Sequence, residues 1–258
     1  MIFTNQVVAV TGAGAGIGKA TALRFAETGA VLALLDKDEK AVKRTAEEVE
    51  VFGGKACAFE VDVLDYNRIC AVIANTVNKY GRVDVWCNCA GVSTMGHVWD
   101  ISEEEWDFNM DVNAKGVFLC TKAVLKPMLK QRYGRVINIA SIASLQADPL
   151  LSHYCASKWA VLGFSKTAAY EVGKYGITIN CVCPSTVCTD MQSREMIWSA
   201  ELQGISRQEV VKQWIAATPA GRLVEADDVA ELVLFLARKE NAMINGAAIP
   251  VTGGSDLA

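Results

Sequence analysis

The sequence lacks any apolar run of the roughly 20 residues that a membrane-spanning helix needs. Its first six residues lack the basic stretch and cleavage site of a secretory signal peptide. It also lacks an excess of basic charge, because 25 Lys and Arg residues stand against 29 Asp and Glu residues. A net charge of −4 leaves no electrostatic footprint for nucleic acid or an anionic membrane. We therefore expect a soluble, cytoplasmic protein with neither partner.

Histidine is scarce too, and this bears on the nine cysteines. Two C-x-C pairs lie inside predicted strands, where both members of a pair point to one sheet face. Such pairs could hold a metal, but neither of the two histidines lies at ligand spacing. Free thiols with apolar neighbours behave as small hydrophobic groups. We expect reduced core thiols and no metal site; the pairs are Cys87/Cys89 and Cys181/Cys183, and the other cysteines with apolar neighbours are Cys57, Cys70, Cys120 and Cys155.

What the sequence does contain is a regular alternation of short apolar runs and amphipathic segments. The predicted strands are 7–10, 31–35, 56–61, 83–87, 135–139, 178–182 and the edge strand 248–251. The predicted helices are 18–28, 38–52, 69–80, one opened by a Ser102/Glu105 capping box, 153–175 and 227–237. This alternation predicts a single α/β domain over residues 1–258, a doubly wound parallel sheet with helices on both faces.

One segment, residues 186–222, breaks the alternation. It follows a strand end, where open α/β sheets bind their ligands, and it carries Met191, Met196, Trp198 and Trp214. It could be an ordinary helical insertion with core aromatics. Its placement favours the interpretation that it forms a lid covering the bound substrate.

A glycine-rich segment, TGAGAGIG over residues 11–18, lies between the first strand and the first helix. Glycines there permit a tight turn and let a pyrophosphate approach the positive end of the helix. Asp36, at the end of the second strand, could accept hydrogen bonds from both ribose hydroxyls, or could merely be a charge at a helix start. Because Asp36 would repel a 2′-phosphate and Ala15 is not basic, we expect NAD rather than NADP, although Lys37 adjoins Asp36.

A pair of side chains that could move a proton lies further along the chain. Tyr154 and Lys158 are four residues apart on a predicted helix, so they share one face. An ammonium one turn away should lower the pKa of the tyrosine from its ordinary value near 10. Ser141 follows the fifth strand and could meet the same substrate oxygen. By itself the pair could also be a surface cation beside an aromatic ring.

Taken together, these motifs resemble the short-chain dehydrogenase/reductase family over nearly the whole chain. The resemblance implies a Rossmann-type fold in which Tyr154 is the general acid/base and Lys158 binds the nicotinamide ribose. It further implies that Ser141 orients the substrate oxygen and that Asn113 holds a water linking Lys158 to solvent. The matching segments are Thr11 to Gly18, Asp62-Val63, Asn88 to Gly91, Asn113, Ser141, Tyr154 with Lys158, Pro184 to Thr189 and Gly253-Gly254.

The resemblance also implies a nucleotide-binding set. Asp62 and Val63 would bracket the adenine, Asn88 would contact the ribose region on the adenosine side, and Val187 with Thr189 would hold the carboxamide. Two positions depart from the family pattern, Cys89 in place of Asn and Ser185 in place of Gly. The full set implied for the cofactor is Gly12, Gly16, Ile17, Gly18, Asp36, Asp62, Val63, Asn88, Tyr154, Lys158, Val187 and Thr189.

The function that this resemblance implies is an NAD(H)-dependent oxidoreductase that interconverts a secondary alcohol and a ketone. Polyol, acetoin and sugar-alcohol dehydrogenases are the most similar group, and a 3-oxoacyl-carrier-protein reductase is the alternative enzyme. A non-catalytic NAD-sensing regulator is the alternative from another class. The family also implies a homotetramer built through helices around 112–131 and 153–175. Residues that could shape the substrate pocket, or simply pack, are His97, Trp99, Gln146, His153 and Trp198.

Overall fold

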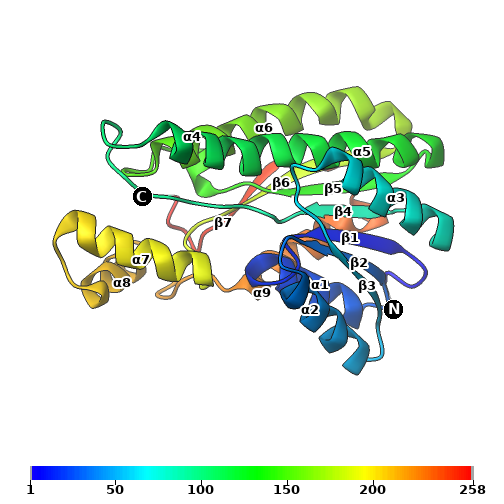
Figure 1. Cartoon of the computed structure of the whole chain (residues 1–258), viewed down its shortest axis with the longest axis horizontal. Coiled ribbons are helices and arrows are strands. Elements are labelled where there is room, and N and C mark those ends of the chain that lie inside the picture. Colours follow the sequence, from blue (N-terminus) through cyan, green and yellow to red (C-terminus); the bar gives the residue numbers. More distant parts are fainter. Residues whose placement is uncertain (1, 257–258) are drawn as a thin grey trace.

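The computed structural model describes residues 2–256 and joins its strands into one seven-stranded parallel sheet (Figure 1). The strand order is β3-β2-β1-β4-β5-β6-β7, so the doubly wound α/β fold is confirmed. Residues 1, 257 and 258 of the predicted domain range lie outside the described residues. The strands are β1 (Val7–Thr11), β2 (Val31–Asp36), β3 (Lys55–Glu60), β4 (Val85–Asn88), β5 (Gly134–Ile139), β6 (Ile177–Pro184) and β7 (Ala248–Val251).

Two apolar layers cover the sheet, and the period of two along each strand separates them. In β1, Val8 and Val10 face one layer while Ala9 faces the other. Helices α1 (Gly16–Glu27), α2 (Glu39–Val51) and α9 (Ala226–Ala237) pack on the first side. Helices α3 (Tyr66–Tyr80), α5 (Gly116–Gln131) and α6 (Ser152–Val172) pack on the second, as Figure 1 shows. Near-continuous apolar strands are what a sheet buried on both faces requires.

Side-chain caps open several helices, among them α2, α3 and α4 (Glu103–Asn109), and one cap explains the largest difference between a predicted and an observed helix start. The helix expected at residue 69 begins at Tyr66, because the Asp65 carboxylate accepts a hydrogen bond from the Arg68 N–H at 2.9 Å. The Ser102/Glu105 capping box is confirmed and opens α4. That helix continues through one π-helical turn, Met110–Lys115, into α5. Four-residue spacing does not predict a π turn, so the sequence pattern missed it.

The segment after β6 forms two helices, α7 (Asp190–Gln203) and α8 (Arg207–Ala216). Thr189 and Ser206 cap their N-termini through side-chain oxygens. In Figure 1 the two helices lie together at one end of the molecule, beyond the helical layers that cover the sheet. The helical insertion predicted for 186–222 is therefore present.

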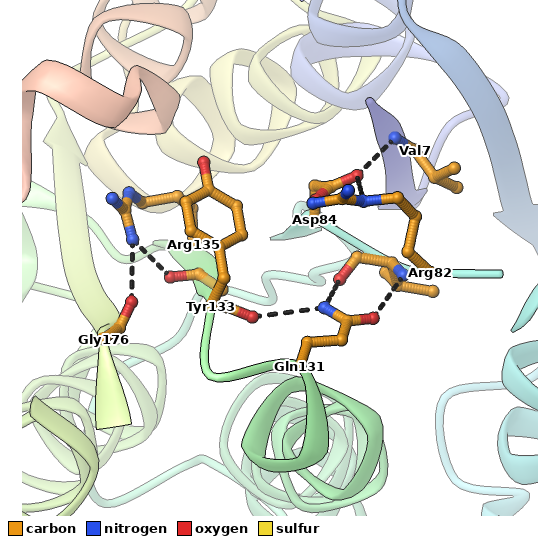
Figure 2. Close-up of polar contacts among 9 residues, drawn as sticks. Val7, Arg82, Asp84, Gln131, Tyr133, Arg135 and Gly176 are labelled. Atoms are coloured by element: carbon orange, nitrogen blue, oxygen red, sulfur yellow. Dashed lines mark hydrogen bonds and ion pairs between the residues drawn. The ribbon is translucent and has the colours of Figure 1, made fainter. Parts of the chain in front are cut away.

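The amino ends of the strands are tied together by a polar network, shown in Figure 2. The fully buried Asp84 carboxylate accepts hydrogen bonds from the Val7 N–H at 2.8 Å and from the Arg82 guanidinium. Arg135, buried against the Tyr133 ring, donates to the Gly176 carbonyl at 3.1 Å. These bonds satisfy buried polar groups at the edge of the sheet opposite the strand ends where ligands bind.

All nine cysteines are free thiols. The apolar surroundings predicted for Cys57 are wrong, because its Sγ lies 3.3 Å from the Lys79 Nζ and 3.4 Å from the Tyr80 hydroxyl. Within residues 2–256 no His, Cys, Asp and Glu side chains are grouped as a metal site. None of the helices in that range combines the length and apolarity that crossing a membrane requires.

Candidate active site

The carboxyl ends of β1 and β4 form the point where the strand order reverses, and the glycine-rich loop lies there. Gly12 has a φ of +64°, and a Cβ on it would lie 2.7 Å from the Ala90 backbone nitrogen. A Cβ on Gly18 would lie only 2.0 Å from the Gly12 carbonyl oxygen. The loop can therefore close against β4 and the first turn of α1 only with glycine at both positions.

A groove with a volume of about 430 Å³ runs along this loop. At its far end, the Asp36 carboxylate accepts hydrogen bonds from the Gly14 N–H at 2.8 Å and the Asp38 N–H at 3.0 Å. Asp36 therefore fixes the loop and also faces the groove. The groove is lined by eight of the predicted nucleotide-binding residues, namely Gly12, Gly16, Ile17, Gly18, Asp36, Asp62, Val63 and Thr189.

A smaller cavity, of about 140 Å³, adjoins the groove. Ile17 and Thr189 line both, so the two spaces are neighbours. Ser141 from the end of β5 lines this cavity, together with Tyr154 and Lys158 from α6. The structure thus brings the three predicted catalytic side chains of this cavity together beside the end of the groove.

Lys158 is held in place by the sheet. Its Nζ donates to the Ile139 carbonyl at 2.9 Å and lies 5.6 Å from the centre of the Tyr154 ring. Only 4% of Lys158 is exposed, and burial lowers the pKa of its ammonium to about 8. A buried cation with one backbone partner has donors left for a ligand, which is the arrangement that ribose hydroxyls need.

Known proteins share this architecture over the whole chain. A family model described as enoyl-(acyl carrier protein) reductase matches residues 12–256. The chain belongs to the short-chain dehydrogenase/reductase family. The meso-2,3-butanediol dehydrogenase of Serratia marcescens is 36% identical over 255 residues, covering 99% of this chain and 96% of that protein.

Two solved structures are also similar. The NAD⁺-bound xylitol dehydrogenase matches with a TM-score of 0.95 at 30% identity, covering 98% of this chain and 100% of the other. The actinorhodin polyketide ketoreductase with NADPH matches with a TM-score of 0.95 at 34% identity, covering 99% and 100%. As a short-chain dehydrogenase/reductase, the protein is an oxidoreductase with a nicotinamide nucleotide cofactor that acts on hydroxyl or keto groups. The groove fits such a group, since it is lined by Gly12, Gly16 and Gly18 of a tight loop that leads into the N-terminus of α1, where backbone N–H groups can bind a pyrophosphate.

Two of the residues that the family implies do not reach these spaces. The Asn88 side chain is 2% exposed and is bonded to Trp86, Thr121 and Asn138, so the role predicted for it at the ribose is not supported by its position. Asn113, in the π turn, is fully buried, and its amide bonds the Val92 backbone and the Ser157 hydroxyl.

The prediction that Lys158 lowers the pKa of Tyr154 is wrong for this structure. Burial is the largest effect and raises the pKa of the phenol, and the negative charge of Glu195 raises it further. A hydrogen bond with Ser141 acts in the opposite direction without reversing the shift. The i, i+4 spacing correctly placed Lys158 beside the ring, but it carried no information on depth or on Glu195.

The cavity also contains acidic residues that sequence reasoning missed. Asp148 from the loop before α6 and Glu195 from α7 both line it. Arg194, next in sequence, lines the nucleotide groove instead. No spacing signal marks these positions, because they reach the site through a loop and an insertion. None of the five suggested pocket residues lines the cavity; they are His97, Trp99, Gln146, His153 and Trp198.

Proposed function

We propose that this oxidoreductase uses NAD(H) to interconvert a secondary alcohol and its ketone. The observation that carries the proposal is the shared wall of Ser141, Tyr154 and Lys158 in a cavity that adjoins the nucleotide groove. The similarity to a butanediol dehydrogenase and to a xylitol dehydrogenase supports a diol or polyol as the substrate class.

Each of the three side chains has a separate task in this proposal. When bound, the nicotinamide supplies or accepts the hydride. The Tyr154 hydroxyl takes the proton from the substrate alcohol in oxidation and returns it to the ketone in reduction. Ser141 orients the substrate oxygen, and Lys158 holds the nicotinamide ribose. Asn113, anchored between Val92 and Ser157, is then a positioning residue that supports the region around Lys158.

The remaining cofactor contacts follow the lining of the two spaces. We assign Asp62 and Val63 to the adenine and Val187 with Thr189 to the carboxamide, since the first pair lines the groove and the second lines the cavity. The segment 186–222 then serves as a substrate lid, because Met191 and Gln192 on α7 line the cavity. A cytoplasmic location stays a prediction.

The test is a spectrophotometric screen for NAD reduction with diols, polyols and hydroxy acids. Turnover of a secondary diol or polyol would support the proposal. The alternative is a 3-oxoacyl-carrier-protein reductase, which is supported by 35% identity over 254 residues to the 3-oxoacyl-[acyl-carrier-protein] reductase of Thermotoga maritima. Turnover restricted to 3-oxoacyl thioesters with NADPH would establish that alternative, and nucleotide binding without turnover of any compound would establish the regulator.

Asp36 should set the cofactor preference. We expect the wild-type kcat/KM to favour NAD over NADP, because the Asp36 carboxylate at the groove would repel a 2′-phosphate. Asp36→Asn keeps the size of the side chain and removes its charge, so it should narrow the preference by about tenfold. Steady-state kinetics with both nucleotides measures this. A wild-type preference for NADP would contradict the prediction, and Lys37→Gln would then identify the cation responsible.

We further propose that the enzyme is a homotetramer. Phe118 on α5 and Trp159 on α6 are 41% and 51% exposed, and Phe118 packs edge-on against Phe164. Large aromatic side chains left open on the two long helices favour burial against another copy. Light scattering at micromolar concentration should give about four times the chain mass of 27.8 kDa. A monomer under these conditions would contradict the proposal.

A further inference from the structure

The substrate cavity carries an uneven distribution of charge. Its charged lining consists of Asp148, Glu195 and Lys158. The Lys158 ammonium is buried and bonded to the Ile139 carbonyl, on the β5 side of the cavity. The two carboxylates come from the loop after β5 and from α7. The cavity therefore has one buried cation on the sheet side and two acidic groups elsewhere in its wall, one from the loop before α6 and one from α7.

Neither carboxylate is neutralised by an ion pair with any of residues 2–256. Desolvation raises the pKa of both Asp148 and Glu195. The negative charge of Asp148 raises the pKa of Glu195 further. Contact with the Ser93 hydroxyl and the charge of Arg194 lower the pKa of Glu195 only in part. Both carboxylates line the same cavity as Tyr154, and their negative charges raise its pKa.

Because Asp148 and Glu195 are two partly desolvated negative charges, the affinity of the cavity for a ligand should depend on the charge of that ligand. A carboxylate in this cavity would meet two like charges, whereas an ammonium group would relieve the repulsion between them. An uncharged hydroxyl would fall between these extremes, since it can donate a hydrogen bond to either carboxylate but carries no charge.

We propose that Asp148 and Glu195 are specificity-determining residues that select small secondary alcohols bearing an ammonium group and reject those bearing a carboxylate. The inference rests on the proposed alcohol–ketone interconversion, and it departs from the diol or polyol class that similarity supports because it uses the charges in the cavity wall. It assigns amino alcohols as preferred substrates, neutral diols as weaker ones and hydroxy acids as the poorest.

Three compounds with one carbon skeleton provide the test: 4-amino-2-butanol, 1,3-butanediol and 3-hydroxybutyrate. They share the carbinol and differ at the far end, which is cationic, neutral or anionic near neutral pH. With NAD, we expect kcat/KM to fall in that order, with about a 100-fold difference between the first and the last. The double variant Asp148→Asn/Glu195→Gln keeps side-chain size and should reduce that difference to within about threefold.

The control is Glu201→Gln, which removes an exposed carboxylate from the same helix, α7, outside both cavities. It should leave the order of the three compounds unchanged. A wild-type preference for 3-hydroxybutyrate, or an order that the double variant does not alter, would overturn the inference.

Calorimetric binding of the same three compounds to the NADH-bound protein, which cannot oxidise them, separates this inference from the proposed function. If none of the compounds is oxidised but the amino alcohol binds most tightly through Asp148 and Glu195, the proposed reaction fails and the charge selection stands. If all three are oxidised with equal kcat/KM and bind equally, the reaction stands and the charge selection fails.

Discussion

Replacing Tyr154 with phenylalanine should lower turnover by roughly 10²–10⁴-fold, the usual scale of general acid/base catalysis. The variant keeps the ring against which the Lys158 ammonium lies and removes only the hydroxyl. The fold and the affinity for NAD should therefore survive. Single-turnover kinetics with the substrate found in the screen, together with NADH binding followed by fluorescence, measures both quantities. A folded Tyr154→Phe enzyme with near-normal turnover would refute the mechanism.

The pH dependence of the oxidation rate of the wild-type enzyme provides a second test of Tyr154 as the catalytic base. Oxidation needs the phenolate as base, so the rate should rise as pH rises through the pKa of Tyr154. Burial and the carboxylates Glu195 and Asp148 raise that pKa, while a hydrogen bond with Ser141 lowers it. The oxidation rate should therefore increase in the alkaline range. Glu195→Gln removes one of the negative charges and should move the rise to lower pH.

Lys158→Met should differ from Tyr154→Phe in kind, because it should weaken NAD binding as well as slow the reaction. We expect a loss of NAD affinity of at least about tenfold, the scale of a hydrogen bond to a charged group. The fold should survive, since methionine replaces an ammonium whose burial is unfavourable, as its lowered pKa of about 8 indicates. Calorimetric titration with NAD measures the affinity, and thermal unfolding measures stability.

The matched control is Lys166→Met, which changes an exposed lysine two turns further along α6. It should leave both NAD affinity and turnover unchanged. A Lys158→Met enzyme that binds NAD as tightly as the wild type would remove the ribose contact from the mechanism.

Features that depend on local sequence were predicted well. The strands follow from runs of apolar residues, and the edge position of β7 follows from Pro250, which cannot donate to a sheet ladder. The glycine loop and the Tyr154/Lys158 pair also depend on spacing alone. Each of these features is decided within about one turn of helix or one strand.

Features that depend on distant contacts were not predicted. Asn88 matches the family motif, but three buried partners hold its side chain away from the groove. The shift in the pKa of Tyr154 depends on depth and on Glu195, which is far away in sequence. Asp148 and Glu195 reach the cavity through a loop and a helix whose positions no periodic pattern specifies.

The arrangement of α7 has a thermodynamic consequence. It packs mainly on α8 and buries few apolar side chains, so the pair can open locally at a lower free energy than the sheet requires for unfolding. Arg194 and Glu195, consecutive on this one helix, line the nucleotide groove and the substrate cavity respectively. Because one helix contributes to both spaces, we expect a ligand in either space to stabilise α7 against local opening and thereby to strengthen binding in the other, and linkage requires this effect to be reciprocal.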